Sequence, residues 1–460
     1  MKRLFVFLTS FFAFLFSATA QVDLEKLMYH PWVDSVFQSL SPDRRIAQLV
    51  WVDVTGGDDV AKQVEVAQLV KAWGVGGVIF FQSEPERLAR LVNYYQSMAQ
   101  TPLLVSMDAE WGVGMRLPGI IPFPYNMMMG ASADPELIKA ATTEMAHQMK
   151  RLGIQVSLAP ACDINTQPLN PIIGMRAFGE SPRLVTDCSV AYMQGLQANG
   201  ILAVAKHYPG HGDTQTDSHF TLPLLPYSRQ RLDSVELYPF RRLAENGIGA
   251  VMTAHLNVPE LDPDPGIPSS LSSRIVENIL RKEWNYKGLI VTDAMNMQGA
   301  QSYGEPGDIE VKALKAGNDV VEFPSDPVSA IRAIKKAVEQ NILTQEEIDR
   351  KCRRVLAAKL WAGLDHRQPV NTGNLIRDLN TPSAELAKRK LIEDALTLLE
   401  NHHNLLPLTR LDTLKIATLS VGEETLTPFQ QMLANFAATD HFNLREGFSS
   451  DELEILKKRL

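Results

Sequence analysis

The sequence predicts an α/β protein whose larger part is a (β/α)8 barrel of the TIM type, followed by a smaller C-terminal part. Short apolar runs alternate with longer helical patterns, as they do in repeated β-α units. These runs show no alternation of polar and apolar residues, which is typical of strands covered on both faces. Charged residues and histidines follow the runs, where a barrel assembles its functional site. An open doubly wound sheet is the alternative fold.

The expected strands can be placed in chain order. They are the runs at residues 48–54, 74–81, 102–108, 156–163, 201–208, 247–255, 288–295 and 318–324. No G-x-G-x-x-G or Walker-type glycine motif follows any of them, so the sequence offers no cradle for a nucleotide and we expect no cofactor. The polar residues that end separate runs are Asp108, Asp163, Lys206, His207, His255 and Asp293.

Residues 1–20 have the pattern of a secretory signal peptide. Lys2 and Arg3 precede the apolar stretch LFVFLTSFFAFLF, and Ala18-Thr19-Ala20 follows as a cleavage site of small residues. Cleavage there leaves Gln21, not a cysteine, at the new N-terminus, which argues against a lipid anchor. No second apolar segment of about 20 residues follows, so we expect no membrane span after signal removal. The mature protein is therefore expected to be exported, to the periplasm or outside the cell.

Length and composition indicate which partners, disulfides and domains the protein is expected to have. The chain has 460 residues and a net charge of −8, which argues against a nucleic-acid partner. Its three cysteines have no metal-type spacing, and we expect no structural disulfide. The chain is longer than a single hydrophobic core of ordinary size usually accommodates, so we expect more than one domain. We expect a barrel at residues 21–365, a linker with a connecting helix at 366–395, and a partial α/β domain at 396–460.

The most informative motif is KHYPGHGDTQTDSH at residues 206–219, directly after the apolar run ILAVA. Each buried polar group without a partner costs about 1–3 kcal/mol, so polar residues at this density must line a wet cleft or contact one another. Two other interpretations stay open. One is a polar surface loop, and the other is a metal site with candidate ligands His207, His211, Asp213, Asp217 and His219.

This motif resembles the signature K-H-F-P-G-H-G-D-T-x-x-D-S-H of the bacterial β-N-acetylglucosaminidases in glycoside hydrolase family 3, and only Tyr208 departs from it. The resemblance covers about residues 40–365. It implies that Asp293, in a T-D-x-x-x-M motif, is the catalytic nucleophile. It also implies that His219 is the general acid/base and that Asp217 orients it. Histidine suits that role because its ordinary pKa of about 6.5 lets it donate and accept a proton near neutrality.

The resemblance further implies which residues hold the sugar. Trp111 replaces the first glycine of the family segment D-x-E-G-G, so the cleft there is expected to be narrower or to offer a stacking platform. Two of the matched residues, Asp163 and His255, are expected to support the others rather than to contact the sugar themselves. The residues matched to sugar-binding positions are Asp108, Arg176, Lys206, His207, Asp163 and His255.

These features together predict an exported, cofactor-independent, retaining exo-β-N-acetylglucosaminidase. The resemblance implies a carbohydrate substrate, namely terminal N-acetylglucosamine on peptidoglycan fragments, that is, muropeptides. Phosphorolysis in place of hydrolysis, a metal-dependent hydrolase on the same barrel, and a non-catalytic muropeptide-binding protein remain open. Residues 396–460 are similar to the start of the α/β sandwich domain of many family members, which indicates a truncated sequence, and a helical appendage is the alternative.

Overall fold

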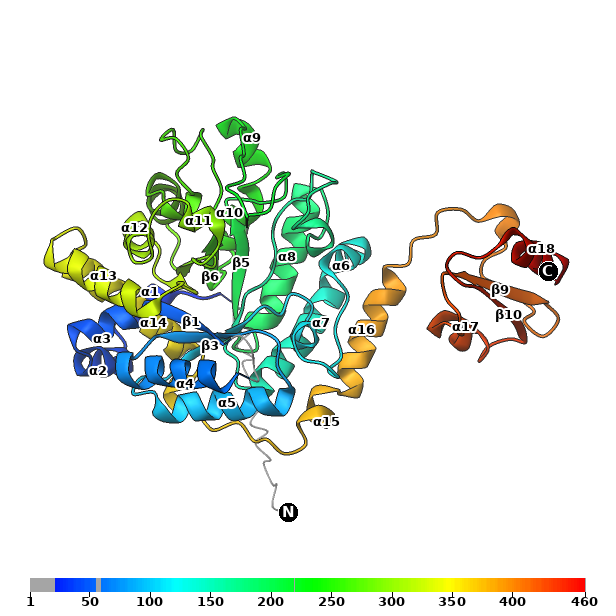
Figure 1. The fold of residues 1–460 in the computed structure, drawn as a ribbon, viewed down its shortest axis with the longest axis horizontal. Coiled ribbons are helices and arrows are strands. Elements are labelled where there is room, and N and C mark those ends of the chain that lie inside the picture. The colour runs from blue at the N-terminus through cyan, green and yellow to red at the C-terminus, as the bar shows by residue number, and fades with distance from the viewer. Residues whose placement is uncertain (1–20, 55–58, 219, 460) are drawn as a thin grey trace, which may run out of the picture. The chain divides into compact units, whose positions relative to one another are not determined.

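The computed structural model describes residues 21–54, 59–218 and 220–459, and its core is a parallel barrel sheet (Figure 1). The strands follow in the order β7-β6-β5-β4-β3-β2-β1-β8. A parallel bridge between Val291 and Val320 brings β7 to the start of β8, so the sheet is nearly closed. The strands are β1 (Val50–Val54), β2 (Gly77–Phe80), β3 (Leu104–Met107), β4 (Val156–Ser157), β5 (Leu202–Tyr208), β6 (Ala250–Thr253), β7 (Leu289–Thr292) and β8 (Val321–Glu322).

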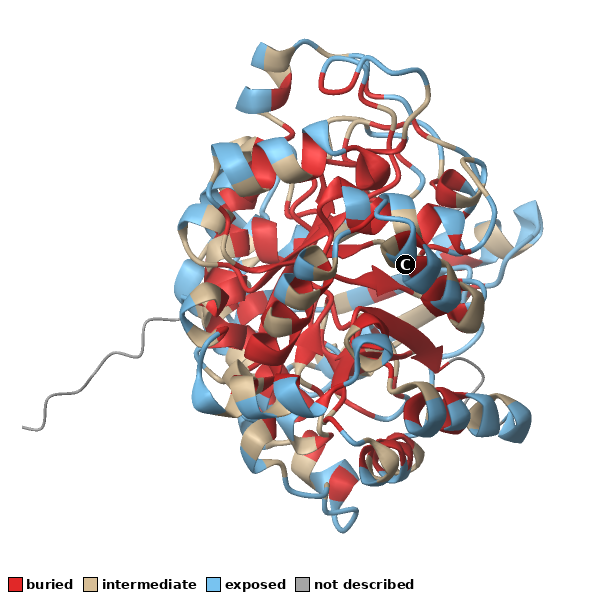
Figure 2. Cartoon of the chain, turned by 90° about the vertical axis from the view of Figure 1, so that its left-hand side faces the viewer, coloured by how far each residue is buried: buried red, intermediate tan, exposed pale blue. Residues whose placement is uncertain are grey.

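The predicted (β/α)8 barrel is confirmed, and the open doubly wound sheet is wrong. Every strand lies inside its predicted run, in the predicted order. All of the barrel strands are buried along their whole length. Figure 2 shows the buried strands inside a layer of helices whose outer sides are exposed. Because both faces of the sheet are covered, apolar residues are favoured at every strand position, which explains the missing alternation.

Helices surround the barrel, and local signals start many of them. Asp134, Ser181 and Asp326 accept amide hydrogen bonds at the first turns of α7 (Pro135–Arg151), α8 (Pro182–Gln197) and α13 (Pro327–Glu339), and a proline follows each. Two helices have π-type hydrogen bonds, η1 (Leu69–Trp73) and η5 (Arg274–Glu283). The α-helices up to the end of the barrel are α1 (Leu24–Leu27), α2 (Pro31–Ser39), α3 (Pro42–Ala47), α4 (Val60–Gln68), α5 (Pro85–Met98), α6 (Asn126–Ser132), α7 (Pro135–Arg151), α8 (Pro182–Gln197), α9 (Arg229–Ser234), α10 (Tyr238–Glu245), α11 (Gln298–Gln301), α12 (Asp308–Ala316), α13 (Pro327–Glu339) and α14 (Gln345–Trp361).

Two further helices, α15 (Leu375–Leu379) and α16 (Pro382–Asp394), pack against α7 and belong to the barrel unit, which ends at Leu396. Residues 397–460 form a second compact unit. Its strands β9 (Ile416–Val421) and β10 (Thr439–Leu444) are parallel, and its helices are α17 (Pro428–Leu433) and α18 (Ser450–Arg459). This small sheet is the α/β element predicted for the C-terminal part.

The predicted signal peptide at residues 1–20 lies outside the described residues. Within the described ranges, no helix is both long and apolar enough to cross a membrane. Cys162, Cys188 and Cys352 are buried as free thiols.

A buried ion cluster holds helices to the end of the barrel opposite the strand carboxyl ends. Asp319, which precedes β8, is fully buried and pairs with Arg281 of η5 and Arg354 of α14. It also accepts a hydrogen bond from the Ile290 amide at 2.9 Å. Burial opposes ionisation of Asp319, but the two arginines and Lys351 hold its pKa below the ordinary value.

We predict that Asp319→Asn destabilises the barrel by about 3–5 kcal/mol, because it leaves two largely buried guanidinium groups without a counter-charge. The folded pKa lies below the unfolded one, so this stabilisation is present above about pH 4 and is lost as the pH falls. Urea unfolding followed by circular dichroism at neutral pH measures the effect. Asp43→Asn, which breaks an exposed pair with Lys335, is the control and should cost less than about 1 kcal/mol. Equal midpoints for the two variants would contradict this view of the cluster.

Candidate active site

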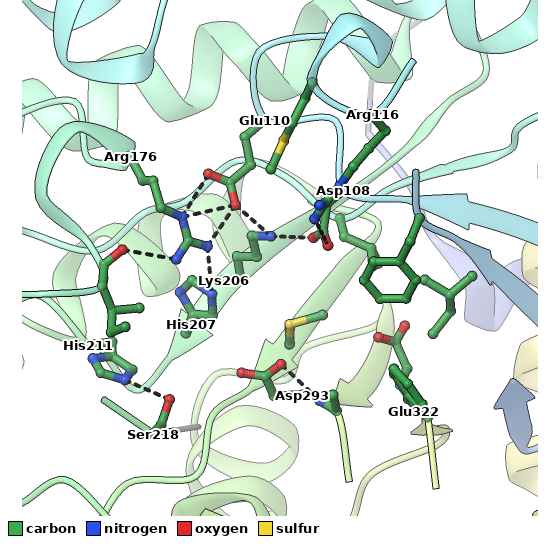
Figure 3. A pocket seen from close by; sticks show the side chains of 18 of the residues that line it. Asp108, Glu110, Arg116, Arg176, Lys206, His207, His211, Ser218, Asp293 and Glu322 are labelled. Atoms are coloured by element: carbon green, nitrogen blue, oxygen red, sulfur yellow. Dashed lines mark hydrogen bonds and ion pairs between the residues drawn. The ribbon is translucent and has the colours of Figure 1, made fainter. Parts of the chain in front are cut away.

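A cavity of about 330 Å³ lies where the carboxyl ends of the strands meet. Asp108 follows β3, Asp293 follows β7, and Glu322 ends β8. Lys206 and His207 lie within β5 near its end. Figure 3 shows these side chains turned toward one another around the cavity. The residues that line it are Ile79, Phe81, Asp108, Glu110, Trp111, Met115, Arg116, Leu158, Ile172, Arg176, Lys206, His207, His211, Ser218, Met252, Asp293, Ala294, Glu322 and Phe323.

An alternating chain of charges forms one wall of the cavity. Lys206 Nζ donates to Asp108 Oδ1 at 2.7 Å and lies 2.8 Å from Glu110 Oε1. Arg176 binds Glu110 with two nitrogens, at 2.7 Å and 3.0 Å, and Arg116 donates to Asp108 Oδ2 at 2.8 Å. Burial opposes ionisation of Asp108 and Glu110, but these cations keep the pKa of both carboxyls below the ordinary value. The wall therefore holds charged donors and acceptors in fixed positions.

His207 continues this wall in a defined tautomer. Arg176 Nη2 lies 3.2 Å from His207 Nε2, and Asp163 Oδ2 lies 2.7 Å from His207 Nδ1. A guanidinium group can only donate, so Nε2 accepts and the hydrogen is on Nδ1. Asp163 does not line the cavity. It is fully buried, and it also accepts hydrogen bonds from the backbone amides of His207 and His211. Burial opposes its ionisation, but His207 and these contacts lower the pKa of Asp163.

Asp293 lies across the cavity from this wall (Figure 3). Its backbone amide donates to Thr253 O at 2.8 Å, and its Oδ1 accepts from the Ala294 amide at 2.8 Å. Burial opposes ionisation, but His207, His255 and the Ala294 amide lower the pKa of Asp293, so it is an anion at neutral pH. A charged carboxylate with a single amide contact on Oδ1 can act as a nucleophile.

His255 does not line the cavity and instead holds the segment after Asp293. Its Nε2 lies 3.1 Å from Ala294 O, which can only accept, and its Nδ1 lies 2.7 Å from Ser270 Oγ. The ring is completely buried. His255 thus fixes the backbone that places the Asp293 carboxylate.

The loop after β5 is held together by His211. The His211 ring lies 3.0 Å from Ser218 Oγ and 2.6 Å from Thr214 Oγ1. Burial, with a smaller effect of His207, lowers the pKa of His211 to about 4, so this ring is neutral at physiological pH. Asp217 is half-buried, and its carbonyl oxygen accepts from the Thr221 amide at 3.0 Å. His219 lies outside the described residues, so its pairing with Asp217 stays a prediction.

Two of the candidate metal ligands, Asp213 and His207, have other partners. Asp213 pairs with Arg231 at 3.3 Å, and Asp163 holds His207. In the part of the chain that the structure describes, no group of three or more histidine, cysteine, aspartate and glutamate side chains is placed to hold a metal ion.

Trp111 forms part of the cavity wall at the position where the family segment has glycine. Its ring is half-buried and packs against Tyr125, with 4.5 Å between the ring centroids. A sugar face stacks readily on an indole, so the replacement supplies an aromatic surface beside the polar wall.

Sequence reasoning missed three charged residues of the cavity. Glu110 could have been found, because it follows Asp108 by two residues in the same motif. Glu322 interrupts an otherwise apolar run at residues 318–324, which is also a usable signal. No pattern in the sequence marks Arg116 as a residue of the cavity. A short turn of 3-10 helix, η2 (Val113–Met115), brings it to Asp108.

Comparison with known proteins identifies relatives over most of the chain. Residues 41–358 match the model of the glycosyl hydrolase family 3 N-terminal domain. Beta-hexosaminidase A of Pseudoalteromonas piscicida is 30% identical over 377 residues, which cover 73% of this chain and 61% of that protein. Beta-hexosaminidase of Nitrosomonas eutropha is 34% identical over 56% of this chain and 75% of its own length. This chain thus spans less than two thirds of the length of the Pseudoalteromonas relative.

A solved structure agrees with these matches. The glycoside hydrolase family 3 beta-N-acetylglucosaminidase from Paenibacillus sp. FPU-7 superposes with a TM-score of 0.77 at 30% identity. The superposition covers 91% of this chain and 82% of that one.

We predict that His207 carries its ring hydrogen on Nδ1. The contacts to Arg176 and Asp163 leave Nε2 as the acceptor. Nitrogen-15 NMR of histidine-labelled protein near neutral pH should show a bare Nε2 for this ring. Arg176→Met should leave Nδ1 protonated, because Asp163 still holds it. The exposed ring of His147 is the control and should show an ordinary mixture of tautomers. A His207 ring protonated on Nε2 alone would contradict the arrangement.

Proposed function

The chain belongs to glycosyl hydrolase family 3, and from this membership and the cavity we propose that it is a β-N-acetylhexosaminidase. In its finer form, the proposal is a retaining exo-β-N-acetylglucosaminidase. The observation that carries it is the Asp293 carboxylate, ionised and facing a wall of fixed hydrogen-bonding groups. The relatives named beta-hexosaminidase and beta-N-acetylglucosaminidase support the choice of sugar.

Asp293 is the proposed nucleophile. Its carboxylate oxygen attacks the anomeric carbon of the terminal sugar, and the bond to the leaving oxygen breaks. The resulting glycosyl ester is then hydrolysed by water, so the product keeps the β configuration. Lys206, Arg176 and Asp108 are suited to hold the sugar hydroxyls, because they present charged donors and acceptors at the cavity surface.

His219 is the proposed general acid/base, with Asp217 as its orienting partner. Ser218, the residue before His219, lines the cavity and is tied to His211 at 3.0 Å. The position of Ser218 at the cavity supports the proposal that its neighbour His219 acts there. A carboxylate beside an imidazole stabilises the imidazolium form, which must donate a proton to the leaving oxygen.

The size of the cavity supports exo action. A volume of about 330 Å³ is at the small end for ligand sites and suits a single sugar residue. We propose peptidoglycan fragments, or muropeptides, as the natural substrate, with export to the periplasm or beyond. The basic, apolar and small-residue pattern of residues 1–20 supports export.

The function is tested by hydrolysis of an aryl β-N-acetylglucosaminide beside the matching β-glucoside. The N-acetylated substrate should be cleaved faster, and proton NMR should show the β-anomer of the sugar as the first product. Asp293→Ala should lower kcat by about a thousandfold or more, because the attacking group is lost. Asp187→Ala, on the exposed side of α8, is the control and should be unaffected. Faster cleavage of the glucoside, or an active Asp293→Ala variant, would refute the assignment.

His219→Ala should discriminate between leaving groups. An activated aryl leaving group departs without a proton, so formation of the glycosyl ester should survive, whereas substrates with poor leaving groups should slow by about 100-fold or more. Steady-state rates on a series of aryl glycosides, plotted against leaving-group pKa, measure the difference. His147→Ala, an exposed histidine of α7, serves as the control. A uniform loss across the series would mean that His219 has a structural role.

A further inference from the structure

Glu322 is a buried carboxyl group of the cavity that the proposed mechanism does not use. It ends β8, is 2% exposed and lines the cavity together with Asp108 and Asp293. Its Oε1 is buried and has no hydrogen-bond partner among the described residues. The other carboxyl groups that line the cavity each accept at least one hydrogen bond.

The backbone holds Glu322 rigidly in this place. Its amide donates to Thr292 Oγ1 at 3.0 Å, and its carbonyl oxygen accepts from the Met295 amide at 2.9 Å. The next residue, Phe323, has a φ of 48°, in the left-handed region that non-glycine residues rarely occupy. Strained backbone of this kind gathers at ligand-binding sites and persists only where the surrounding structure enforces it.

The surroundings of Glu322 favour its uncharged form. Burial raises its pKa well above the ordinary value, and the negative charges of Asp108 and Asp293 raise it further, while Lys206 acts in the opposite sense. The same cavity therefore favours the ionised form of Asp293 and the neutral form of Glu322. A neutral carboxyl group has one O–H donor, which an ionised one lacks.

We propose that Glu322 is a substrate-binding residue whose carboxyl O–H donates a hydrogen bond to an oxygen of the sugar bound in the cavity. The inference rests on the proposed function, because a sugar supplies the acceptor that the described residues do not. A neutral carboxyl group whose O–H donor stays unpaired beside the cavity costs about 1–3 kcal/mol, and a bound sugar oxygen would supply the acceptor. A neutral donor also holds the sugar beside Asp293 without adding a second free anion that would compete with it for the electron-poor anomeric carbon.

Two substitutions at this position separate a donor from a space-filling side chain. Glu322→Gln keeps the shape, the neutral charge and an N–H donor, so KM should stay within about threefold of wild type. Glu322→Leu removes the donor, and KM should rise about tenfold with kcat changed much less, as expected for the loss of one hydrogen bond. Glu310→Gln is the matched control. Glu310 is likewise a buried glutamate with a raised pKa, caused mainly by burial, but it accepts from the Gly307 amide and does not line the cavity.

The pH dependence of sugar binding gives a second measurement that does not need Glu322→Leu to fold. Inhibition by free N-acetylglucosamine should weaken at alkaline pH in the wild type, because the raised pKa of Glu322 keeps the donor at neutral pH and releases its proton as the pH rises. Glu322→Gln should remove this step, whereas Glu310→Gln should keep it. Asp108, Asp293 and Lys206 remain charged in all three proteins.

The KM values of the Glu322 variants and the pH dependence of inhibition either support or overturn the proposed role of Glu322. An unchanged KM for Glu322→Leu, or an alkaline step that persists in Glu322→Gln, would overturn the proposal. Equal impairment of the Gln and Leu variants would also overturn it, because a charged acceptor would then be required. The wild-type rate on the aryl N-acetylglucosaminide tests the proposed function separately. The variants are compared, in KM and in inhibition by the corresponding free sugar, on whichever aryl glycoside the wild type cleaves best.

Discussion

The arrangement of the cavity depends on the buried ammonium group of Lys206. It joins Asp108 and Glu110, which follow β3, to its own strand β5, at 2.7 Å and 2.8 Å. A buried ammonium ion without counter-charges would be strongly destabilising, so the two carboxylates and the lysine require one another. Burial lowers the pKa of Lys206, but both carboxylates raise it more, and the lysine stays charged. Glu110 in turn binds Arg176, and Arg176 and Asp163 contact the two ring nitrogens of His207 and favour the same tautomer.

Carboxyl groups of the same chemical type are given different properties by what surrounds them. Asp108 and Glu110 are saturated by cations and serve as fixed acceptors. Asp293 is kept ionised by histidine rings and one amide, with no lysine or arginine in direct contact among the described residues. No cation and no backbone amide contacts the Glu322 carboxyl group among the described residues, and its pKa is raised, mainly by burial. A site that needs an anion in one place and a neutral donor in another obtains both by distributing its cations unevenly.

The sequence predicts the barrel well, because strands buried on both faces must be apolar throughout and their runs can be counted. It also predicts that Asp108, Lys206, His207 and Asp293 come together, since parallel strands bring their carboxyl ends to one edge. It does not predict element length: β4 is only Val156–Ser157, although the apolar run continues for several residues. The missing information is which polar group faces which, and that depends on turns such as η2, whose geometry no local pattern encodes.

The sequence also does not tell which partners surround the two histidines of the loop after β5. In the sequence, His211 and His219 lie eight positions apart in one motif, and only the family resemblance singles out His219 as the proton donor. The structure describes His211, where burial lowers the pKa to about 4 and leaves the ring neutral between Thr214 and Ser218. Protonation of His211 therefore does not disturb its contacts with Thr214 and Ser218 over the pH range in which a histidine with an ordinary pKa of about 6.5 gains and loses its proton. A general acid/base at His219 needs such a support, because its own charge changes during every catalytic cycle and the residues that place it must not titrate with it.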